Sequence, residues 1–197
     1  MPVRLDADVP GWTPRPAPAT ARPAAVLVLV APDRNGPDGL ADPDAEAEVI
    51  LIERADHGHH SGEISFPGGG ADPDEDPVTT ALREAAEEVG LDVVAAGVVV
   101  VGDLESFWIP VSDYRVHPVL AIAARRPQLA GSADEVVSII RAPLSAFVGV
   151  ASVEIVEATI RDMRLRYGAY RVLGHRVWGA TARVLGQLGA LLGGPAG

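Results

Sequence analysis

The sequence contains no cysteine and no lysine, and all 16 of its basic residues are arginine. Without cysteine, a thiol nucleophile, a disulfide framework and a thiolate zinc site are excluded. Without lysine, a Walker-type phosphate loop and a Schiff-base mechanism are excluded as well. No apolar run approaches the roughly 20 residues that span a bilayer, and the N-terminus lacks the layout of a signal peptide. We therefore expect a cytoplasmic protein with no membrane partner.

Basic charge is also scarce, because 27 acidic residues outweigh the 16 arginines and give a net charge of -11. A protein that reads a phosphate backbone carries a basic face, so nucleic acid is not an expected partner. A small phosphorylated ligand would have to be met by local arginines and by metal ions. At 197 residues the chain is long enough to form one domain with a proper hydrophobic core.

The stretch from Gly69 to Leu91 carries the strongest local pattern. Asp76 is suited to cap a helix, Pro77 suits the first helical position, and Gly90 can adopt the left-handed conformation that ends one. These signals predict a helix over residues 77–89. An apolar stripe along it is expected to face a core, formed by Val78, Leu82, Ala85, Ala86 and Val89.

Three glutamates of this helix, Glu84, Glu87 and Glu88, stand at i, i+3 and i+4, where their carboxylates crowd together. Two like charges about 4 Å apart repel by roughly 4 kcal/mol at an effective dielectric of about 20. Arg83 is placed to pair with Glu87, and Glu75 arrives from the preceding loop. Such a set of oxygen ligands suits a hard divalent cation. A solvated acidic helix face is the alternative interpretation.

The spacing resembles the Nudix box, G-x5-E-x7-R-E-U-x-E-E-x-G-U, where U is aliphatic and Ala85 is the one weak fit. The resemblance implies a hydrolase that uses Mg2+ or Mn2+ to add water across a diphosphate bond, because metal ions bridge a carboxylate cage to a polyanionic substrate. It implies metal ligation by Glu84, Glu87 and Glu88, with Glu75 completing or orienting the set. Arg83 would fix Glu87. Glu84 or Glu135 would take the proton of the attacking water.

A loop with three of the five histidines, His57, His59 and His60, precedes the box. A zinc site is disfavoured because no cysteine or fourth histidine lies nearby. A loop that donates hydrogen bonds to phosphate is better supported, since imidazoles and glycine-rich backbone both donate to oxyanions. A polar hairpin with no ligand role stays open.

The same loop resembles the coenzyme A diphosphatase group of the Nudix superfamily, with its pattern L-L-T-x-R-[SA]-x3-R-x3-G-x3-F-P-G-G. The matching residues imply a substrate site formed by Arg54, His60, Gly62, Phe66, Gly68 and Gly69. The loop is one residue short, Gly58 stands in place of the group's second arginine, and Glu53 replaces a threonine. The implied products of coenzyme A are 3',5'-ADP and 4'-phosphopantetheine. Another nucleoside diphosphate compound, such as ADP-ribose or a dinucleotide, and a non-catalytic nucleotide-binding module stay open.

Apolar runs predict the remaining elements of an α+β protein. Strands are expected at 24–30, 49–52, 98–101, 119–124, 135–144 and 153–160, with the last forming a hairpin with 163–170 that turns near residues 168–169. A C-terminal helix is expected over about 175–192. The predicted architecture is a Nudix-like α/β/α sandwich, with a mixed sheet between the box helix and the C-terminal helix. Its domain should span 24–192, after a Pro/Ala-rich arm at 1–23 and before a tail at 193–197; a homodimer is left open.

Overall fold

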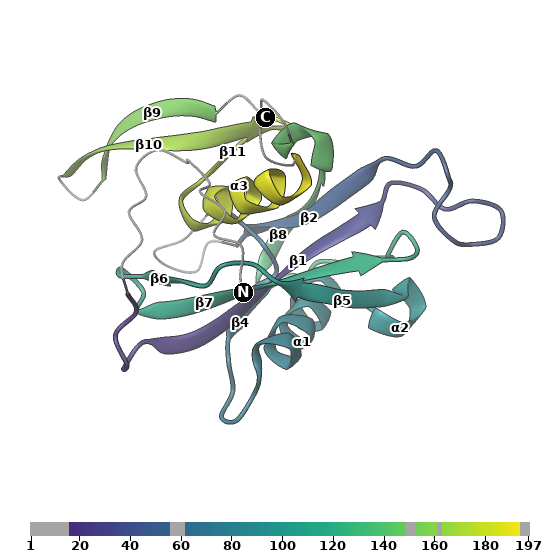
Figure 1. Cartoon of the computed structure of the whole chain (residues 1–197), viewed down its shortest axis with the longest axis horizontal. Helices are drawn as coiled ribbons and strands as arrows, with labels where there is room; N and C mark the ends of the chain where they lie inside the picture. The colour runs from purple at the N-terminus through teal and green to yellow at the C-terminus, as the bar shows by residue number, and fades with distance from the viewer. Residues whose placement is uncertain (1–15, 56–61, 149–152, 161–162, 194–197) are drawn as a thin grey trace.

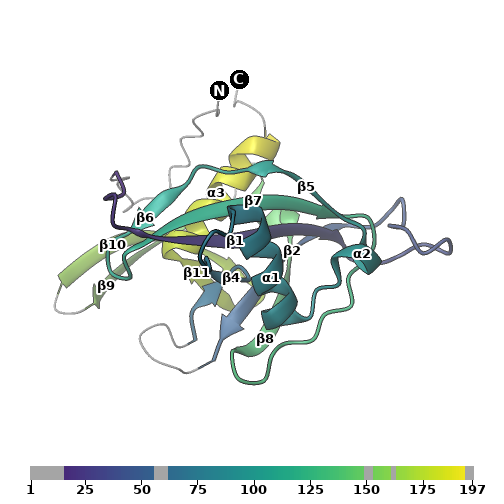
Figure 2. The same cartoon turned by 90° about the horizontal axis from the view of Figure 1, so that it is seen from below.

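The computed structural model describes residues 16–55, 62–148, 153–160 and 163–193. A large sheet lies between two helices, α1 (Pro77–Val89) on one face and α3 (Gly179–Gly193) on the other (Figure 1). The turned view shows α1 in front of the sheet and α3 behind it (Figure 2). The predicted α/β/α sandwich is confirmed. Within the described residues, no helix is both long and apolar enough to cross a bilayer.

The large sheet has eight strands, and its central path runs β3-β2-β1-β7-β5. β8 pairs with β2, β4 with β1 and β6 with β7. Only β1 and β7 pair in parallel, so the sheet is mixed, as predicted. The strands are β1 (Arg22–Pro32), β2 (Ala47–Arg54), β3 (Ile64–Ser65), β4 (Gly68–Gly70), β5 (Val98–Asp103), β6 (Phe107–Ile109), β7 (Tyr114–Ala123) and β8 (Val136–Pro143).

Both faces of the central strands are buried, which explains why β1 is apolar along most of its length rather than alternating. Successive side chains of a strand point to opposite faces. Leu27 and Leu29 therefore lie in the apolar cluster under α1, and Val28 lies in the cluster under α3. Each large apolar side chain buried in this way contributes roughly 1.5–3 kcal/mol. β1 is thus the strand that both halves of the core share.

Helix α1 begins and ends where its sequence predicts. The Asp76 carboxylate accepts hydrogen bonds from the amides of Val78 and Thr79, at 2.9 and 3.0 Å. Gly90 has a φ of 65°, the left-handed conformation that closes the helix. The predicted stripe is wrong at Ala86, which is exposed, while Ala81 is buried against the sheet instead. Helical residues five apart lie on different faces, so Ala81 and Ala86 cannot share one.

Two short helices follow, α2 (Val93–Ala96) and the 3-10 helix η1 (Leu144–Phe147). A separate sheet of three antiparallel strands, β9 (Val153–Ile160), β10 (Met163–Val172) and β11 (His175–Trp178), lies beside α3 (Figure 1). The turn predicted near residues 168–169 is wrong, because Gly168 and Ala169 lie inside β10 and pair with Ile155 and Glu154. A glycine inside a strand does not by itself interrupt the ladder of hydrogen bonds.

The predicted C-terminal helix is confirmed, but it begins at Gly179 rather than His175. His175–Trp178 forms β11, and Trp178 pairs with Ala169 of β10. Gly179 has a φ of 63°, which separates the strand from the helix. Within α3, the Thr181 hydroxyl donates a buried hydrogen bond of 2.9 Å to the carbonyl of Ile64 in β3. The last helix is thereby attached to the strand that leads into β4.

Candidate active site

Strand β4 brings three glycines against β1 on one side and α1 on the other. Gly68 has a φ of 153°, and a Cβ there would lie 2.4 Å from the carbonyl oxygen of Ala25. At Gly69 a Cβ would lie 2.5 Å from Oε2 of Glu84. Only glycine permits the backbone to approach both the strand and the carboxylate this closely. The glycine-rich end of the loop therefore forms one wall of the candidate site.

Arg83 is the centre of an ion-pair network on α1. Its Nε lies 2.9 Å from Glu75 Oε1, and its Nη1 lies 2.8 Å from Glu84 Oε1 and 3.0 Å from Glu87 Oε2. Its Nη2 also donates to Glu75 Oε2 at 3.0 Å and to the Gly70 carbonyl at 3.1 Å. The expected pair with Glu87 is present, but Arg83 contacts three glutamates rather than one. It offsets the repulsion among them.

Glu75 is held in its ionised form by this network. The hydrogen bonds from Arg83, with those from the Asp72 amide and the Thr80 hydroxyl, lower the pKa of Glu75 to about 2. The Thr80 hydroxyl lies 3.0 Å from Glu75 Oε2, and Thr80 is fully buried. The loop before α1 thus turns Glu75 back toward the helix, as the sequence predicts.

Glu88 is buried, with 2% of its surface exposed, although it carries a carboxylate. Its Oε2 accepts a 2.8 Å hydrogen bond from the Gly68 amide, and its Oε1 lies 3.2 Å from Nη1 of Arg54 at the end of β2. A buried carboxylate needs such partners because desolvation disfavours its charge. Three separate elements therefore meet at this one side chain.

The surroundings raise the pKa of Glu88 to about 7. Burial is the largest cause, and the charges of Glu84 and Glu135 act in the same direction. The Gly68 amide and the Arg54 guanidinium oppose the shift but do not cancel it. Perturbed carboxyl groups of this kind cluster at functional sites, because chemistry needs a group whose protonation can change near neutral pH.

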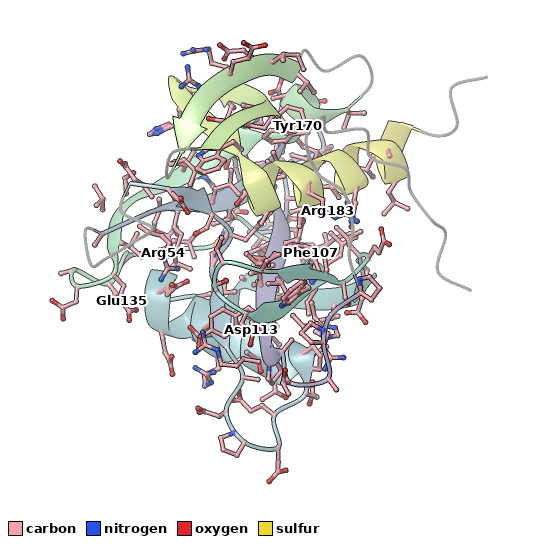
Figure 3. All side chains as sticks on the ribbon, turned by 90° about the vertical axis from the view of Figure 1, so that its left-hand side faces the viewer. Arg54, Phe107, Asp113, Glu135, Tyr170 and Arg183 are labelled. Atoms are coloured by element: carbon pink, nitrogen blue, oxygen red, sulfur yellow. The ribbon has the colours of Figure 1, made fainter. Side chains whose placement is uncertain are left out.

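The remaining predicted carboxylates differ in their exposure. The Glu87 side chain is 57% exposed, so it does not share one surface with buried Glu88. Glu135 is exposed just before β8, and its backbone carbonyl accepts a 2.9 Å hydrogen bond from the Ala55 amide, next to Arg54. Arg54 and Glu135 lie on the same side of the molecule (Figure 3). The structure thus brings Glu84, Glu88, Glu135 and Arg54 into one neighbourhood.

The predicted substrate loop divides into a part that faces this neighbourhood and a part that does not. Gly62 has a φ of 68° and donates a 3.1 Å hydrogen bond to the carbonyl of Arg54, the last residue of β2. Phe66 is 3% exposed and belongs to the core under α3, so its ring is a core contact rather than a ligand contact. His60 lies outside the described residues, as do His57 and His59.

The chemistry of the donor set fits a hard divalent cation, because every candidate ligand is a carboxylate oxygen and several lie at low exposure. Across the described ranges, no three acidic or histidine side chains are assembled around one point. The reason is visible in the contacts: Arg83 holds Glu75, Glu84 and Glu87, while Arg54 and Gly68 hold Glu88. The carboxylates that would bind a cation are therefore the same ones that pair with Arg54 and Arg83 in this structure.

Two relationships in this site could not be read from the motif. Arg54 pairs with Glu88 across 34 positions of sequence, and the Gly68 amide supports the same carboxylate across 20. The signal in the sequence is an arginine at the end of an apolar strand, and the resemblance of the loop assigns it to substrate binding. That Arg54 is the partner of the buried Glu88 carboxylate becomes evident only from the folded structure.

Comparison with known proteins identifies relatives of this chain. A family model described as NUDIX domain matches residues 22–141. A protein named Uncharacterized Nudix hydrolase NudL from Photorhabdus laumondii subsp. laumondii is 34% identical over 133 residues, covering 66% of this chain and 68% of the relative. The protein of the same name from Yersinia pestis is 31% identical over 172 residues, covering 86% of this chain and 79% of the relative.

Solved structures show the same fold. The Nudix hydrolase RenU from M. smegmatis aligns with a TM-score of 0.51 and 25% identity over 64% of this chain and 73% of its own. A MutT/nudix family protein from Enterococcus faecalis aligns with a TM-score of 0.51 and 17% identity over 89% of this chain and 63% of its own. The family model covers more than half of the sequence, and three glutamates of the box, Glu84, Glu87 and Glu88, lie on one helix beside a glycine-rich strand. The chain therefore belongs to the Nudix family of hydrolases.

Proposed function

We propose that this protein hydrolyses the diphosphate bond of coenzyme A or its derivatives, with Mg2+ or Mn2+, to 3',5'-ADP and 4'-phosphopantetheine. Membership of the family makes it a hydrolase of nucleoside diphosphate compounds. The observation that supports the site is the buried Glu88 carboxylate between the Gly68 amide and the Arg54 guanidinium. The choice of coenzyme A rests on the likeness of the loop from Leu51 to Gly69 to that group.

The metal ligands in this proposal are Glu84, Glu87 and Glu88, with Glu75 completing or orienting the set. Bound divalent cations would supply Lewis acidity and neutralise the charge that develops on the diphosphate. Arg83 would position Glu75, Glu84 and Glu87 through the contacts it already makes. The arginine keeps these side chains in a narrow set of orientations, which lowers the entropy cost of gathering them.

The proton of the attacking water would pass to Glu84 or to Glu135. Glu84 is supported by its place against Gly69, because the backbone there leaves room for a carboxylate and little else. Glu135 is supported by its exposure and by its electrostatic contact with Glu88. Variants of each, assayed for the pH dependence of kcat, would separate the two candidates.

Arg54, Gly62, Gly68 and Gly69, with His60, form the proposed substrate side. The Arg54 side chain is 38% exposed and donates from only one of its nitrogens to Glu88. Its remaining donors make no hydrogen bond to any residue that the structure describes, so in this proposal they reach a phosphate oxygen. Gly58, where the coenzyme A group has a second arginine, favours the alternative that ADP-ribose or a dinucleotide is the better substrate.

A substrate panel at fixed Mg2+ tests the proposal. Coenzyme A, ADP-ribose and a dinucleotide polyphosphate would be compared by kcat/KM, with products identified by mass spectrometry. We expect the highest kcat/KM for coenzyme A and the two products named above. A higher value for ADP-ribose would move the specificity to that class, and no turnover of any diphosphate would favour a nucleotide-binding module. The sequence also predicts a small-molecule substrate and a cytoplasmic location. It leaves open whether the protein forms a homodimer.

A further inference from the structure

A second polar site lies at the other end of the sheet from the box glutamates. Gly68–Gly70 pairs with the first half of β1, from Ala24 to Val26, whereas the second site follows the last residues of β1 and β7. It is a pocket of about 220 Å3 lined in part by Ala95 and Ala96 of α2. Helix α2 lies at the opposite end of the central strands from β4 (Figure 1). Its lining residues include Asn35, Asp92, Arg125, Arg126 and Gln128.

The two arginines of this pocket have no acidic partner within 4 Å among the described residues. The Arg125 guanidinium is held by a 3.4 Å hydrogen bond to the Ala95 carbonyl. The Nε of Arg126 is buried and has no hydrogen-bond partner in the described part of the chain. Two arginines that line one pocket without an ion pair are unusual in a protein whose net charge is -11.

A third arginine adds to the local positive charge. Arg141 of β8 donates to the carbonyl of Pro127, a pocket residue, at 2.8 Å. Its only acidic neighbour in the described ranges is Glu48, at 3.5 Å. Burial and the charge of Arg126 lower the pKa of Arg141. With Glu48 and with Asp92, which also lines the pocket, three guanidinium groups face two carboxylates, and an anion in the pocket would offset the remaining positive charge.

One neutral side chain of the lining, Asn35, is placed to donate. The Oδ1 of Asn35 accepts from the Arg126 amide at 2.6 Å, which leaves the Asn35 side-chain nitrogen as a donor. Asp92 is the single acid of the lining, and its Oδ1 is already engaged by the amides of Val94 and Ala95. A guanidinium offers paired N–H groups that match the oxygens of phosphate. Two such groups balance a doubly charged, tetrahedral oxyanion.

We propose that the pocket formed by Asn35, Arg125, Arg126 and Gln128 is a second, non-catalytic anion site that binds a phosphate group, either free or as a phosphomonoester. The site does not depend on the hydrolase reaction or on metal, because none of its residues belongs to the box. A phosphorylated ligand could thus occupy this end of the protein while the other end is free.

The experiment is a titration of the metal-free protein, in EDTA, with inorganic phosphate at constant ionic strength, followed by NMR of the arginine Nε–Hε resonances. We expect saturable shifts of Arg125 and Arg126, and an affinity reduced at least about tenfold in Arg126→Gln, since a charge-assisted hydrogen bond is lost. Arg171→Gln is the matched control: its side chain is 57% exposed and lies on the other sheet. It should retain phosphate affinity within about twofold.

Thermal unfolding in a phosphate-free chloride buffer checks that Arg126→Gln is folded. If it is not, the phosphate affinity of Arg125→Gln is compared with the wild type instead. Absence of saturable binding, unchanged affinity in the pocket variant, or an equal loss in Arg171→Gln would overturn the proposal. Competition by AMP would assign the site to phosphomonoesters, and its failure would assign it to free phosphate. Retained phosphate binding in Glu88→Gln would separate this site from the proposed active site.

Discussion

The guanidinium of Arg54 lies 3.2 Å from the carboxylate of Glu88, and the side chain of that glutamate is 3% exposed. The strand β2 and the helix α1 are thus joined at the site by one ion pair. Burial raises the pKa of Glu88, whereas the Gly68 amide and the arginine charge lower it, so Arg54 is one of the groups that set the pH at which this carboxylate becomes charged. The pairing makes Arg54 a positioning residue as well as a proposed phosphate ligand.

Replacement of Arg54 by glutamine should therefore alter the pH profile and not only the affinity. Without the cation, the pKa of Glu88 rises further, so the acidic limb of kcat/KM moves to higher pH. We expect kcat/KM to fall by about 10- to 100-fold at pH 7. Arg54→Lys, which keeps the charge, should restore most of the pH profile. If Arg54→Gln changed only KM, and the acidic limb of the kcat/KM profile stayed at the same pH, Arg54 would be assigned to substrate binding only.

Glu88→Gln should separate activity from stability. The folded pKa is raised to about 7, above the ordinary value of 4.5, so the folded state binds more protons than the unfolded state between these pH values. In EDTA, wild-type stability should fall as pH rises through this window, by up to about 2–3 kcal/mol, while the glutamine variant shows no such loss. At pH 8 the variant should be the more stable protein, with kcat lowered by orders of magnitude.

Denaturant unfolding at pH 5 and pH 8 measures the pH dependence of stability. Steady-state turnover with Mg2+ measures the loss of kcat. Glu87→Gln serves as the control for stability, since its side chain is 57% exposed and should leave the pH dependence unchanged. Near-wild-type turnover by Glu88→Gln would remove Glu88 from the proposed metal set.

Arg83→Gln should destabilise the protein most at neutral pH and low salt. The substitution leaves Glu75, Glu84 and Glu87 without their common partner. We expect Tm to fall by about 3–8 °C at pH 7 in EDTA. Since the pKa of Glu75 is lowered to about 2 in the wild type, the stability that this pair contributes is present above pH 4.5 and is lost as pH falls toward 2.

The difference in Tm between wild type and Arg83→Gln should accordingly narrow in acid, and added Mg2+ should recover part of it at pH 7. Calorimetry from pH 3 to pH 7 provides the test. A gap in Tm that stayed constant over this range would show that Arg83 acts through packing of its stem and not through its charge.

Two adjacent glycines should respond differently to alanine. At Gly69 the added Cβ meets the end of the flexible Glu84 side chain, so Glu84 moves and activity falls by about 10-fold or more while Tm changes little. At Gly68 it meets the backbone of Ala25, 2.4 Å away, at a φ of 153°, so the variant should lose about 2–4 kcal/mol of stability. Equal losses of stability at the two positions would contradict this assignment.

The parts of the structure that depend on contacts between residues close in sequence were predictable. Asp76 and Gly90 fix the ends of α1 through contacts within a few residues, so its bounds are correct. The start of α3 was not, since Val177 and Trp178 extend the helical spacing of the apolar residues that follow, yet His175–Trp178 pairs with β10 as a strand. Pairing with a distant strand outweighed the local pattern. The burial of Glu88 was likewise hidden, because neighbouring Glu87 is equally acidic in sequence and lies exposed.

The hydrogen bond from Thr181 to the carbonyl of Ile64 joins the end of the chain to the segment that enters the glycine-rich wall. Ile64 lies four positions before Gly68, whose amide supports Glu88. We therefore expect docking of the first turn of α3 to support the alignment of the Gly68 amide with Glu88. A chain without α3 would lose this support for the strand that enters the glycine-rich wall.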